Sequence, residues 1–237
     1  MEEKATVLAE LVREMARHNG DLPLVQRLCR SVASILGASG VSITLAYDTP
    51  ERATLCATDE VAARLDDLQE VLAQGPSQTA YTTGTPVHAL LEGEETSPWP
   101  ELDAAVHDEL GILEVHAFPI GPYDEVLGVL TCHHSVGTSL RLDDARAQFL
   151  ADAVGVALLR DPESVLDDAG PWSSRSTIHQ ATGMVMAQLH VPADDALALL
   201  KARAFAGGES LAATSAAVVR REVDFRSPDG AEGDESR

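Results

Sequence analysis

The chain of 237 residues has few cysteines, few aromatic residues and little positive charge. Its three cysteines, Cys29, Cys56 and Cys132, form no CxxC pair and no zinc-binding spacing, which favours buried thiols in a reducing compartment over a disulfide framework. Aromatic residues make up 4% and hydrophobic residues 45%, so the core must consist mainly of Ala, Val and Leu. Acidic residues outnumber basic ones by 38 to 17, a net charge of −21. A surface that carried this charge evenly would repel nucleic acids and anionic membranes.

Long hydrophobic runs are also missing. The longest uncharged stretch, residues 73–91, is interspersed with Gly, Pro, Gln, Ser and Thr. It predicts the end of a helix, a loop and a strand rather than a membrane span. The first residues, Met1-Glu2-Glu3-Lys4, are not followed by the apolar segment of a secretory signal. We therefore expect a cytoplasmic protein with no membrane partner.

No motif of a common enzyme class is present. The sequence has no P-loop, no GxGxxG and no HExxH, and residues 75–79 lack the second glycine of a nucleophile elbow. The carboxylate pairs are scattered, which is typical of solvated helix faces rather than of a general acid and base. We expect no enzymatic activity and no cofactor. These pairs are Asp66-Asp67, Glu94-Glu95 and Asp143-Asp144.

The charge is distributed unevenly. Residues 1–170 hold 10 basic and 29 acidic residues, residues 171–226 hold 6 and 5, and residues 227–237 hold 1 and 4. A stretch rich in Pro, Gly and acids separates the first two parts, which is typical of a linker. The composition predicts an N-terminal domain at 1–160, a linker at 161–171, a C-terminal domain at 172–226 and a disordered acidic tail at 227–237.

The N-terminal region alternates between helical and strand periodicity. Apolar residues at helical spacing predict helices at 7–15 and 24–36, and Asp21 is the expected N-cap of the second, with Pro23 in its first turn and Gly37–Gly40 as its end. This order of elements predicts an α+β domain with an antiparallel sheet flanked by helices. The remaining predicted elements are strands at 41–47, 53–57, 86–91, 113–120 and 125–134 and helices at 61–74 and 142–160, with turns at 48–51 and 121–124.

Four segments of this region carry a family resemblance. Residues 75–87, Trp99-Pro100, residues 117–120 and residues 127–130 resemble the GAF sensor domains of actinobacterial regulators, and the similarity extends over about 5–160. The resemblance implies a small-molecule pocket between the sheet and its connecting loops, or a dimerisation scaffold. It does not identify the ligand. The predicted strand directions suggest Tyr47, Thr82, His116 and Thr131 as pocket residues.

The C-terminal region predicts three short helices. Val191-Pro192 ends the first, Asp194-Asp195 begin the second, Gly207-Gly208 end the second, and Ser210 caps the third. Ser173-Ser174 is the expected N-cap of the first helix. The pattern predicts an all-α bundle of three helices. The apolar faces are Ile178, Ala181, Val185 and Leu189 on the first helix, Ala196, Leu199, Leu200 and Ala204 on the second, and Leu211, Ser215, Val218 and Val219 on the third.

This bundle also carries a resemblance. Residues 175–186, with Asp195-Ala196-Leu197, Leu199-Leu200-Lys201 and Leu211 after them, resemble the ANTAR domain over about 172–226. The resemblance implies RNA binding and transcription antitermination, in which two modules of a homodimer stabilise a paired-hairpin RNA in a nascent transcript. Two positions depart from the family: Thr182 replaces the usual Lys and removes a cation, and Ser215 replaces Ala. The residues that fit the first-helix pattern are Arg175, Ile178, Gln180, Ala181, Gly183 and Met186.

RNA binding requires groups for phosphates and for bases. Gln180 and Thr182 are the candidates for base contacts, and Trp172 and Phe205 are the aromatic residues available for stacking. Gly183 has two interpretations, close approach of another helix or close approach of the RNA backbone, and we expect helix packing first. The candidates for phosphate contacts are Arg175, Lys201, Arg203, Arg220, Arg221 and Arg226.

Other functions remain open alternatives. A three-helix bundle can also bind DNA, although the third helix, residues 211–219, has almost no polar side chains to read bases. The module could instead act through protein contacts alone. On the strand at 125–134, Cys132 and His134 share one face and His133 takes the other, with His116 as a possible neighbour. Two or three such ligands are too few for a closed tetrahedral site, so we predict no bound metal. The target transcript and the direction of regulation stay undetermined.

Overall fold

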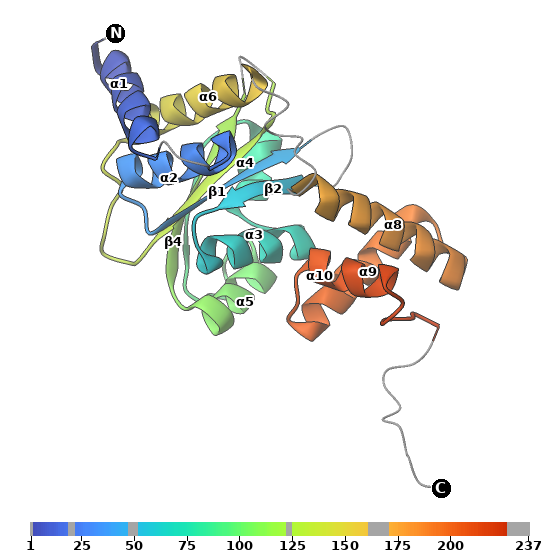
Figure 1. Ribbon diagram of the computed structural model, residues 1–237. Coiled ribbons are helices and arrows are strands. Elements are labelled where there is room, and N and C mark those ends of the chain that lie inside the picture. The colour runs from blue at the N-terminus through green and yellow to red at the C-terminus, as the bar shows by residue number, and fades with distance from the viewer. Residues whose placement is uncertain (1, 19–21, 47–51, 122–124, 161–170, 227–237) are drawn as a thin grey trace, which may run out of the picture. The chain divides into compact units, whose positions relative to one another are not determined.

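Five antiparallel strands form the sheet of the N-terminal unit, in the order β2-β1-β5-β4-β3. The computed structural model describes residues 2–18, 22–46, 52–121, 125–160 and 171–226 (Figure 1). It divides into two compact units, residues 1–172 and 173–237. The strands are β1 Gly40–Ala46, β2 Arg52–Ala57, β3 Val87–Leu91, β4 Leu113–Ile120 and β5 Gly128–His134.

Several predicted features lie outside the described residues. These are the Asp21 cap, Tyr47, most of the two turns at 48–51 and 121–124, the linker at 161–170 and the tail at 227–237. The antiparallel sheet and its flanking helices confirm the predicted α+β class.

Helices cover both faces of the sheet (Figure 1). On one face, α1, α2 and α6 enclose the larger apolar cluster, and on the other face α3, α4 and α5 enclose two smaller ones. The alternation of strand side chains sorts residues between these layers, because successive residues point to opposite faces. The helices are α1 Glu2–Arg17, α2 Leu24–Leu36, α3 Glu60–Leu72, α4 Pro76–Thr83, α5 Pro100–Leu110 and α6 Asp144–Arg160.

Strand β1 shows this sorting clearly. Val41, Ile43 and Leu45 belong to the cluster under α1, α2 and α6. Thr44 points to the other face, where its hydroxyl donates to Asp66 of α3. One face of the sheet is therefore almost entirely apolar near its centre, and the other combines apolar and polar side chains.

The three cysteines are free thiols and buried, as predicted. The Cys29 thiol lies 3.4 Å from the Val41 carbonyl oxygen and the Cys56 thiol 3.5 Å from that of Val25. Burial raises the pKa of Cys132 to about 12. Its thiol therefore stays protonated and behaves as a small apolar side chain of the core.

Two helices of this unit were not predicted. The segment 73–91, expected to continue as a loop after its first helix, contains α4, and the region before β4 contains α5. Both helices are short and begin at a proline, Pro76 and Pro100, which occupies the first helical turn without losing a hydrogen bond. Pro23 is the N-cap of α2 rather than part of its first turn.

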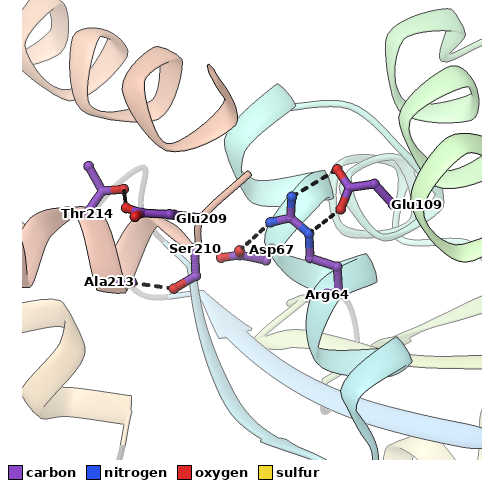
Figure 2. A network of polar contacts seen from close by, with 7 residues as sticks. All are labelled: Arg64, Asp67, Glu109, Glu209, Ser210, Ala213 and Thr214. Carbon is purple, nitrogen blue, oxygen red and sulfur yellow. Dashed lines mark hydrogen bonds and ion pairs between the residues drawn. The ribbon is translucent and has the colours of Figure 1, made fainter. Parts of the chain in front are cut away.

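An ion-pair network connects α3 and α5 (Figure 2). The guanidinium of Arg64 donates two hydrogen bonds to Glu109, at 2.7 and 3.0 Å, and a third to Asp67, at 3.0 Å. This bidentate geometry raises the pKa of Arg64 further. It connects α5 to α3 in addition to the apolar contacts that Leu102 and Val106 of α5 make in the core.

The C-terminal unit contains α8 Pro171–Leu189, α9 Ala193–Gly207 and α10 Leu211–Val219. Asp194 and Asp195 lie in the first turn of α9, and Gly208 ends it in the left-handed conformation (φ 62°), both as predicted. None of the helices within the described ranges combines the length and apolar content that crossing a bilayer requires.

The caps of the C-terminal unit were predicted with mixed success. Ser210 caps α10, because its hydroxyl accepts a hydrogen bond of 3.0 Å from the Ala213 amide, and Glu209 accepts one from Thr214 (Figure 2). Ser173 and Ser174 do not cap α8, because that helix already begins at Pro171.

The predicted apolar faces are largely buried. Ile178, Ala181 and Val185 on α8 and Ala196, Leu200 and Ala204 on α9 are buried. Leu199 departs from the prediction and is 37% exposed. It follows Ala196 by three positions, but Leu200 and Ala204 define a face that is rotated slightly away from it.

Candidate functional site

One side of α8 forms an exposed stripe. We call it the α8 stripe; its members recur every three or four residues, opposite the buried face of the helix. The helix has no Asp or Glu from Pro171 to Leu189. In a chain with 38 acidic residues, this helix presents an outer surface without any carboxylate of its own. The stripe consists of Ser176, His179, Gln180, Gly183, Met186 and Ala187.

Gly183 lies in the middle of the stripe. A Cβ atom at this position would meet no heavy atom within 4 Å among the described residues. The expectation that Gly183 allows another helix of the chain to pack closely is therefore wrong. The second interpretation, an approach by a molecule outside the chain, stays open because Gly183 is exposed and nothing covers it among the described residues.

Thr182 does not belong to this surface. Its side chain is buried, and its hydroxyl donates a 2.8 Å hydrogen bond to the carbonyl of Ile178. In this structure the Thr182 hydroxyl is therefore not presented to a base. The spacing in the sequence indicates this burial. Thr182 lies four residues after the buried Ile178 and three before the buried Val185, so all three share one face of the helix.

The basic residues at the end of the unit form local ion pairs. Arg220 donates to Glu222 at 2.9 Å, and Arg226 donates to Asp224 at 2.6 Å. The Arg226 guanidinium lowers the pKa of Asp224 to about 2. These side chains stay well exposed, with 58% and 66% of the arginine surface open to solvent. Exposed pairs of this kind contribute little to stability, so a phosphate can replace the carboxylate.

The other predicted phosphate contacts differ in accessibility. Arg203 on α9 and Arg221 after α10 are exposed, and Lys201 is partly buried. The side chains of Arg175 and Trp172 lie outside the described part of the chain, whereas Phe205, the second stacking candidate, is 44% exposed.

Helix α10 offers little for reading bases. Its hydroxyl residues Thr214 and Ser215 are buried, and Glu209 accepts the hydrogen bond of Thr214. The more exposed positions, Ala212, Ala213, Ala216 and Ala217, carry only methyl groups. A recognition helix needs hydrogen-bonding side chains toward the base edges, so this surface does not favour the DNA-binding alternative.

The predicted ligand pocket of the N-terminal unit does not assemble. Thr131 is buried and pairs in register with Ala117, so both face α4, whereas His116 pairs with Cys132 and points to the opposite face. Thr82 is exposed and its hydroxyl donates back to the Gln78 carbonyl within α4. The strand directions were predicted separately, and only the register between β4 and β5 shows that His116 and Thr131 are on different sides.

Polar groups that sequence reasoning missed lie on the side of α3 and α4. Thr44 and Thr54 donate to one carboxylate oxygen of the buried Asp66, at 2.9 and 3.1 Å. Gln69 is buried, and its amide oxygen accepts from the Ser77 amide. The Gln69 amide nitrogen and the Thr131 hydroxyl have no hydrogen-bond partner within the described protein. Buried polar atoms in this state are expected to find a partner outside the chain, either a water molecule or a ligand.

Three histidines and a glutamate gather on the other face, at the β3 end of the sheet. Nε2 of His88 donates to a carboxylate oxygen of Glu114 at 2.9 Å, and the His88 ring stacks on His116 with centroids 4.2 Å apart. The Nε2 atoms of His116 and His134 are 3.1 Å apart. Burial, and then the proximity of His88 and His134, lower the pKa of His116 to about 4. We call these four residues the histidine cluster.

The alternation along β5 confirms one prediction. His134 joins this cluster, whereas His133 points to the other face and contacts Asp59 at 3.3 Å. Cys132 shares the face of His134 but lies in the apolar core. Glu114 and His116 are two residues apart on β4 and therefore share a face, as their spacing in the sequence indicates. That β3 brings His88 beside them depends on the strand order, which the sequence did not show.

Comparisons with known proteins are consistent with this division. The GAF domain profile matches residues 22–158, and the ANTAR domain profile matches residues 172–219. No curated protein matches the chain.

Solved structures similar to this chain include GAF domains. The GAF domain of a phosphoenolpyruvate-protein phosphotransferase from Coxiella burnetii is 16% identical, with 68% of this chain and 96% of that chain covered and a TM-score of 0.46. The GAF-B domain of DevS from Mycobacterium smegmatis is 13% identical, with 59% and 93% covered and a TM-score of 0.40.

Proposed function

Because the chain belongs to the GAF domain family and carries an ANTAR domain after it, we propose that it is a signal-responsive regulator that binds hairpin RNA and acts by transcription antitermination. In this proposal the GAF domain receives a small-molecule signal and the ANTAR domain contacts nascent transcripts in the cytoplasm. No catalytic step is involved.

The α8 stripe is the observation that carries this proposal. RNA phosphates are repelled by carboxylates, and a chain of net charge −21 can bind RNA only where carboxylates are absent. The stripe has no acidic residue, offers Gln180 for hydrogen bonds to bases, and is open above Gly183. Unpaired loop bases, whose edges and faces are accessible, are the natural partners of such a surface.

Phosphate contacts would come from the exposed arginines. Arg203, Arg220 and Arg221 are the described candidates, with Arg175 as a further one on α8. Each phosphate contact is expected to contribute about 0.7–0.9 to the slope of log K against log salt concentration. So few cations give a weak site in one copy. A homodimer that engages two hairpin loops would raise the affinity through effective concentration.

Exposed apolar residues on the N-terminal unit support a homodimer. Leu8 and Val12 lie one turn apart on α1 and are 41% and 68% exposed. Val156 and Leu159 lie one turn apart on α6, which packs against α1, and are 42% and 53% exposed. Two neighbouring helices that both expose aliphatic side chains are suited to self-association.

A signal acts only if its ligand binds two states of the protein with different affinity. The buried polar groups between the sheet and α3 and α4, with the Gln69 amide and the Thr131 hydroxyl available, suit a small polar ligand. Helix α6 ends at Arg160, just before the ANTAR domain, so a ligand-dependent shift of α6 is our proposed route to the output domain.

The direct test is RNA binding by the full chain. We expect a two-hairpin RNA to be bound more tightly than a DNA duplex of equal length. The affinity for RNA should fall as the salt concentration rises from about 50 to about 200 mM, because phosphate contacts are sensitive to salt in this range. Fluorescence anisotropy with labelled nucleic acids measures both. Equal binding of RNA and DNA, or no binding of the RNA, would refute the proposal.

A pair of charge-matched variants tests the surface. Gly183→Glu places a carboxylate in the middle of the α8 stripe, where the added side chain has room. We expect it to weaken RNA binding about 10-fold or more, equivalent to about 1.4 kcal/mol. Ala104→Glu on α5 adds the same charge at an exposed position of the N-terminal unit and should leave affinity unchanged. Equal effects of the two variants would show that the stripe is not the interface.

A further inference from the structure

The histidine cluster has the geometry and the donor atoms of a metal site. A ligand atom from each of His88, Glu114 and His116 lies within 4.8 Å of the other two. The three residues come from adjacent strands, His88 from β3 and Glu114 and His116 from β4, and the register places His88 directly opposite His116. We propose that these three side chains bind a divalent first-row transition metal ion, with Zn²⁺ as the best match, and that His134 positions His116.

The role of His134 follows from its hydrogen bonds. Its Nδ1 atom lies 3.1 Å from the Ser135 carbonyl oxygen and 3.0 Å from the Thr138 hydroxyl. The Thr138 hydroxyl donates its own proton to Ser135, and a carbonyl can only accept. Nδ1 of His134 must therefore carry the proton, and its Nε2 keeps a lone pair.

This tautomer determines the next one. Nε2 of His134 accepts a hydrogen bond from Nε2 of His116, 3.1 Å away. Nδ1 of His116 is then the atom with a lone pair. A ligating histidine whose second nitrogen donates to a fixed acceptor is the usual arrangement in protein metal sites, because it sets both the tautomer and the ring orientation.

The donor set selects the class of ion. Two imidazole nitrogens and one carboxylate suit Zn²⁺ and its neighbours in the first transition row, whereas Mg²⁺ and Ca²⁺ require oxygen ligands. Three protein ligands leave a fourth position for water. The exposure of His88, 53% of its side chain, gives an ion direct access from solvent.

Binding requires one local movement. The stacked rings of His88 and His116, inclined by 12°, present their lone pairs side by side rather than toward one point. The exposed ring of His88 must turn away from this stack, exchanging its hydrogen bond with Glu114 for a bond to the ion. The bound ion would then fasten β3, the edge strand, to β4.

The test uses the full chain without a polyhistidine tag, after treatment with a chelator and dialysis. We expect one Zn²⁺ ion per chain in competition with a chromophoric chelator, and a rise in Tm when Zn²⁺ is added, because a ligand that binds only the folded state stabilises it. His88→Ala and Glu114→Gln should lower the affinity by about 100-fold or more, and His134→Gln by about 10- to 100-fold.

His107→Ala is the matched control. His107 is an exposed histidine beside Asp108 on α5, outside the cluster, so this variant should bind Zn²⁺ like the parent chain. Circular dichroism in the presence of chelator checks that each variant is folded, and His88→Ala is the safest, since His88 is exposed. The proposal is overturned if the parent chain binds no Zn²⁺ at micromolar concentration, or if His88→Ala and Glu114→Gln bind it as tightly as His107→Ala.

Discussion

The two units of the chain are stabilised in different ways. The N-terminal unit buries large aliphatic residues against both faces of a sheet whose strands are joined by long-range hydrogen bonds. The C-terminal unit consists of three helices, whose backbone hydrogen bonds are local, and many of its buried side chains are small. These small buried residues include Ala181, Thr182, Ala196, Ala204, Thr214 and Ser215.

Charge divides the units in the same way. Residues 1–170 carry a net charge of −19 and residues 171–226 a net charge of +1. Small buried residues let the helices of the C-terminal unit form a bundle without large apolar side chains, and the exposed face of α8 stays free of carboxylates. The stability of the N-terminal unit therefore depends on strand register and close packing. The C-terminal unit depends on the caps at its helix ends, and its α8 surface is distinguished by the absence of carboxylates.

The largest effect is expected at a close approach of β5 to β1 in the N-terminal unit. A Cβ atom at Gly128 of β5 would lie 2.2 Å from the Thr44 carbonyl oxygen of β1, and backbone cannot move aside without breaking the sheet. We expect Gly128→Ala to lower the free energy of unfolding by about 3 kcal/mol or more, measured by urea denaturation.

Gly137→Ala is the control for this substitution. Gly137, unlike Gly128, has a positive φ, 86°, and an added Cβ there would meet no heavy atom within 4 Å among the described residues. Its cost should be only the backbone strain, about 1–2 kcal/mol. If both variants lose the same stability, close packing of β1 and β5 does not dominate this unit.

An intermediate effect is expected from the buried carboxylate. Thr44→Val keeps the shape of the side chain but removes the hydroxyl that donates to Asp66. Because a buried carboxyl oxygen then loses one of its hydrogen-bond donors, we expect a loss of about 2 kcal/mol in urea denaturation. Thr82→Val on the exposed side of α4 should change stability by less than about 0.5 kcal/mol. If Thr44→Val lowers the free energy of unfolding no more than Thr82→Val does, the buried hydrogen bond to Asp66 does not stabilise this unit.

The smallest effect is expected at the cap of α10. Ser210→Ala removes the acceptor of the Ala213 amide, at a cost of about 1 kcal/mol. We expect faster hydrogen exchange of the amides at 211–219, with the amides of β1 and β5 unaffected. Ser176→Ala, on the exposed α8 stripe, should leave exchange in α10 unchanged. Equal acceleration in both units would contradict a local role for the cap.

Some of the site could be predicted because its signals are local. The side-chain alternation along β5 predicted that Cys132 and His134 face one way and His133 the other, and the histidine contacts confirm it. The prediction that His116 and Thr131 line one pocket was wrong because it depends on how two separate strands are aligned. His116 and Thr131 are on adjacent strands, and only their register shows that they face opposite layers.

Two residues of α8 show that residue type alone does not place a side chain on one side of a helix. Thr182 is polar, yet it lies on the buried face of α8 and satisfies its hydroxyl within the helix. Gly183 is small, yet nothing within the described chain packs on it. The burial of Thr182 and the exposure of Gly183 both depend on which side of α8 packs against the other helices of its unit.

The sequence by itself determined the α+β class, the separation of an acidic sensor from a near-neutral helical domain, and the helix ends at Gly208 and Ser210. Periodicity, caps and charge are properties of neighbouring residues, so they can be read along the chain. Only the tertiary structure decided that His88, Glu114, His116 and His134 meet and that the α8 stripe is open. These juxtapositions depend on strand order and helix orientation, which arise from contacts between residues far apart in the sequence.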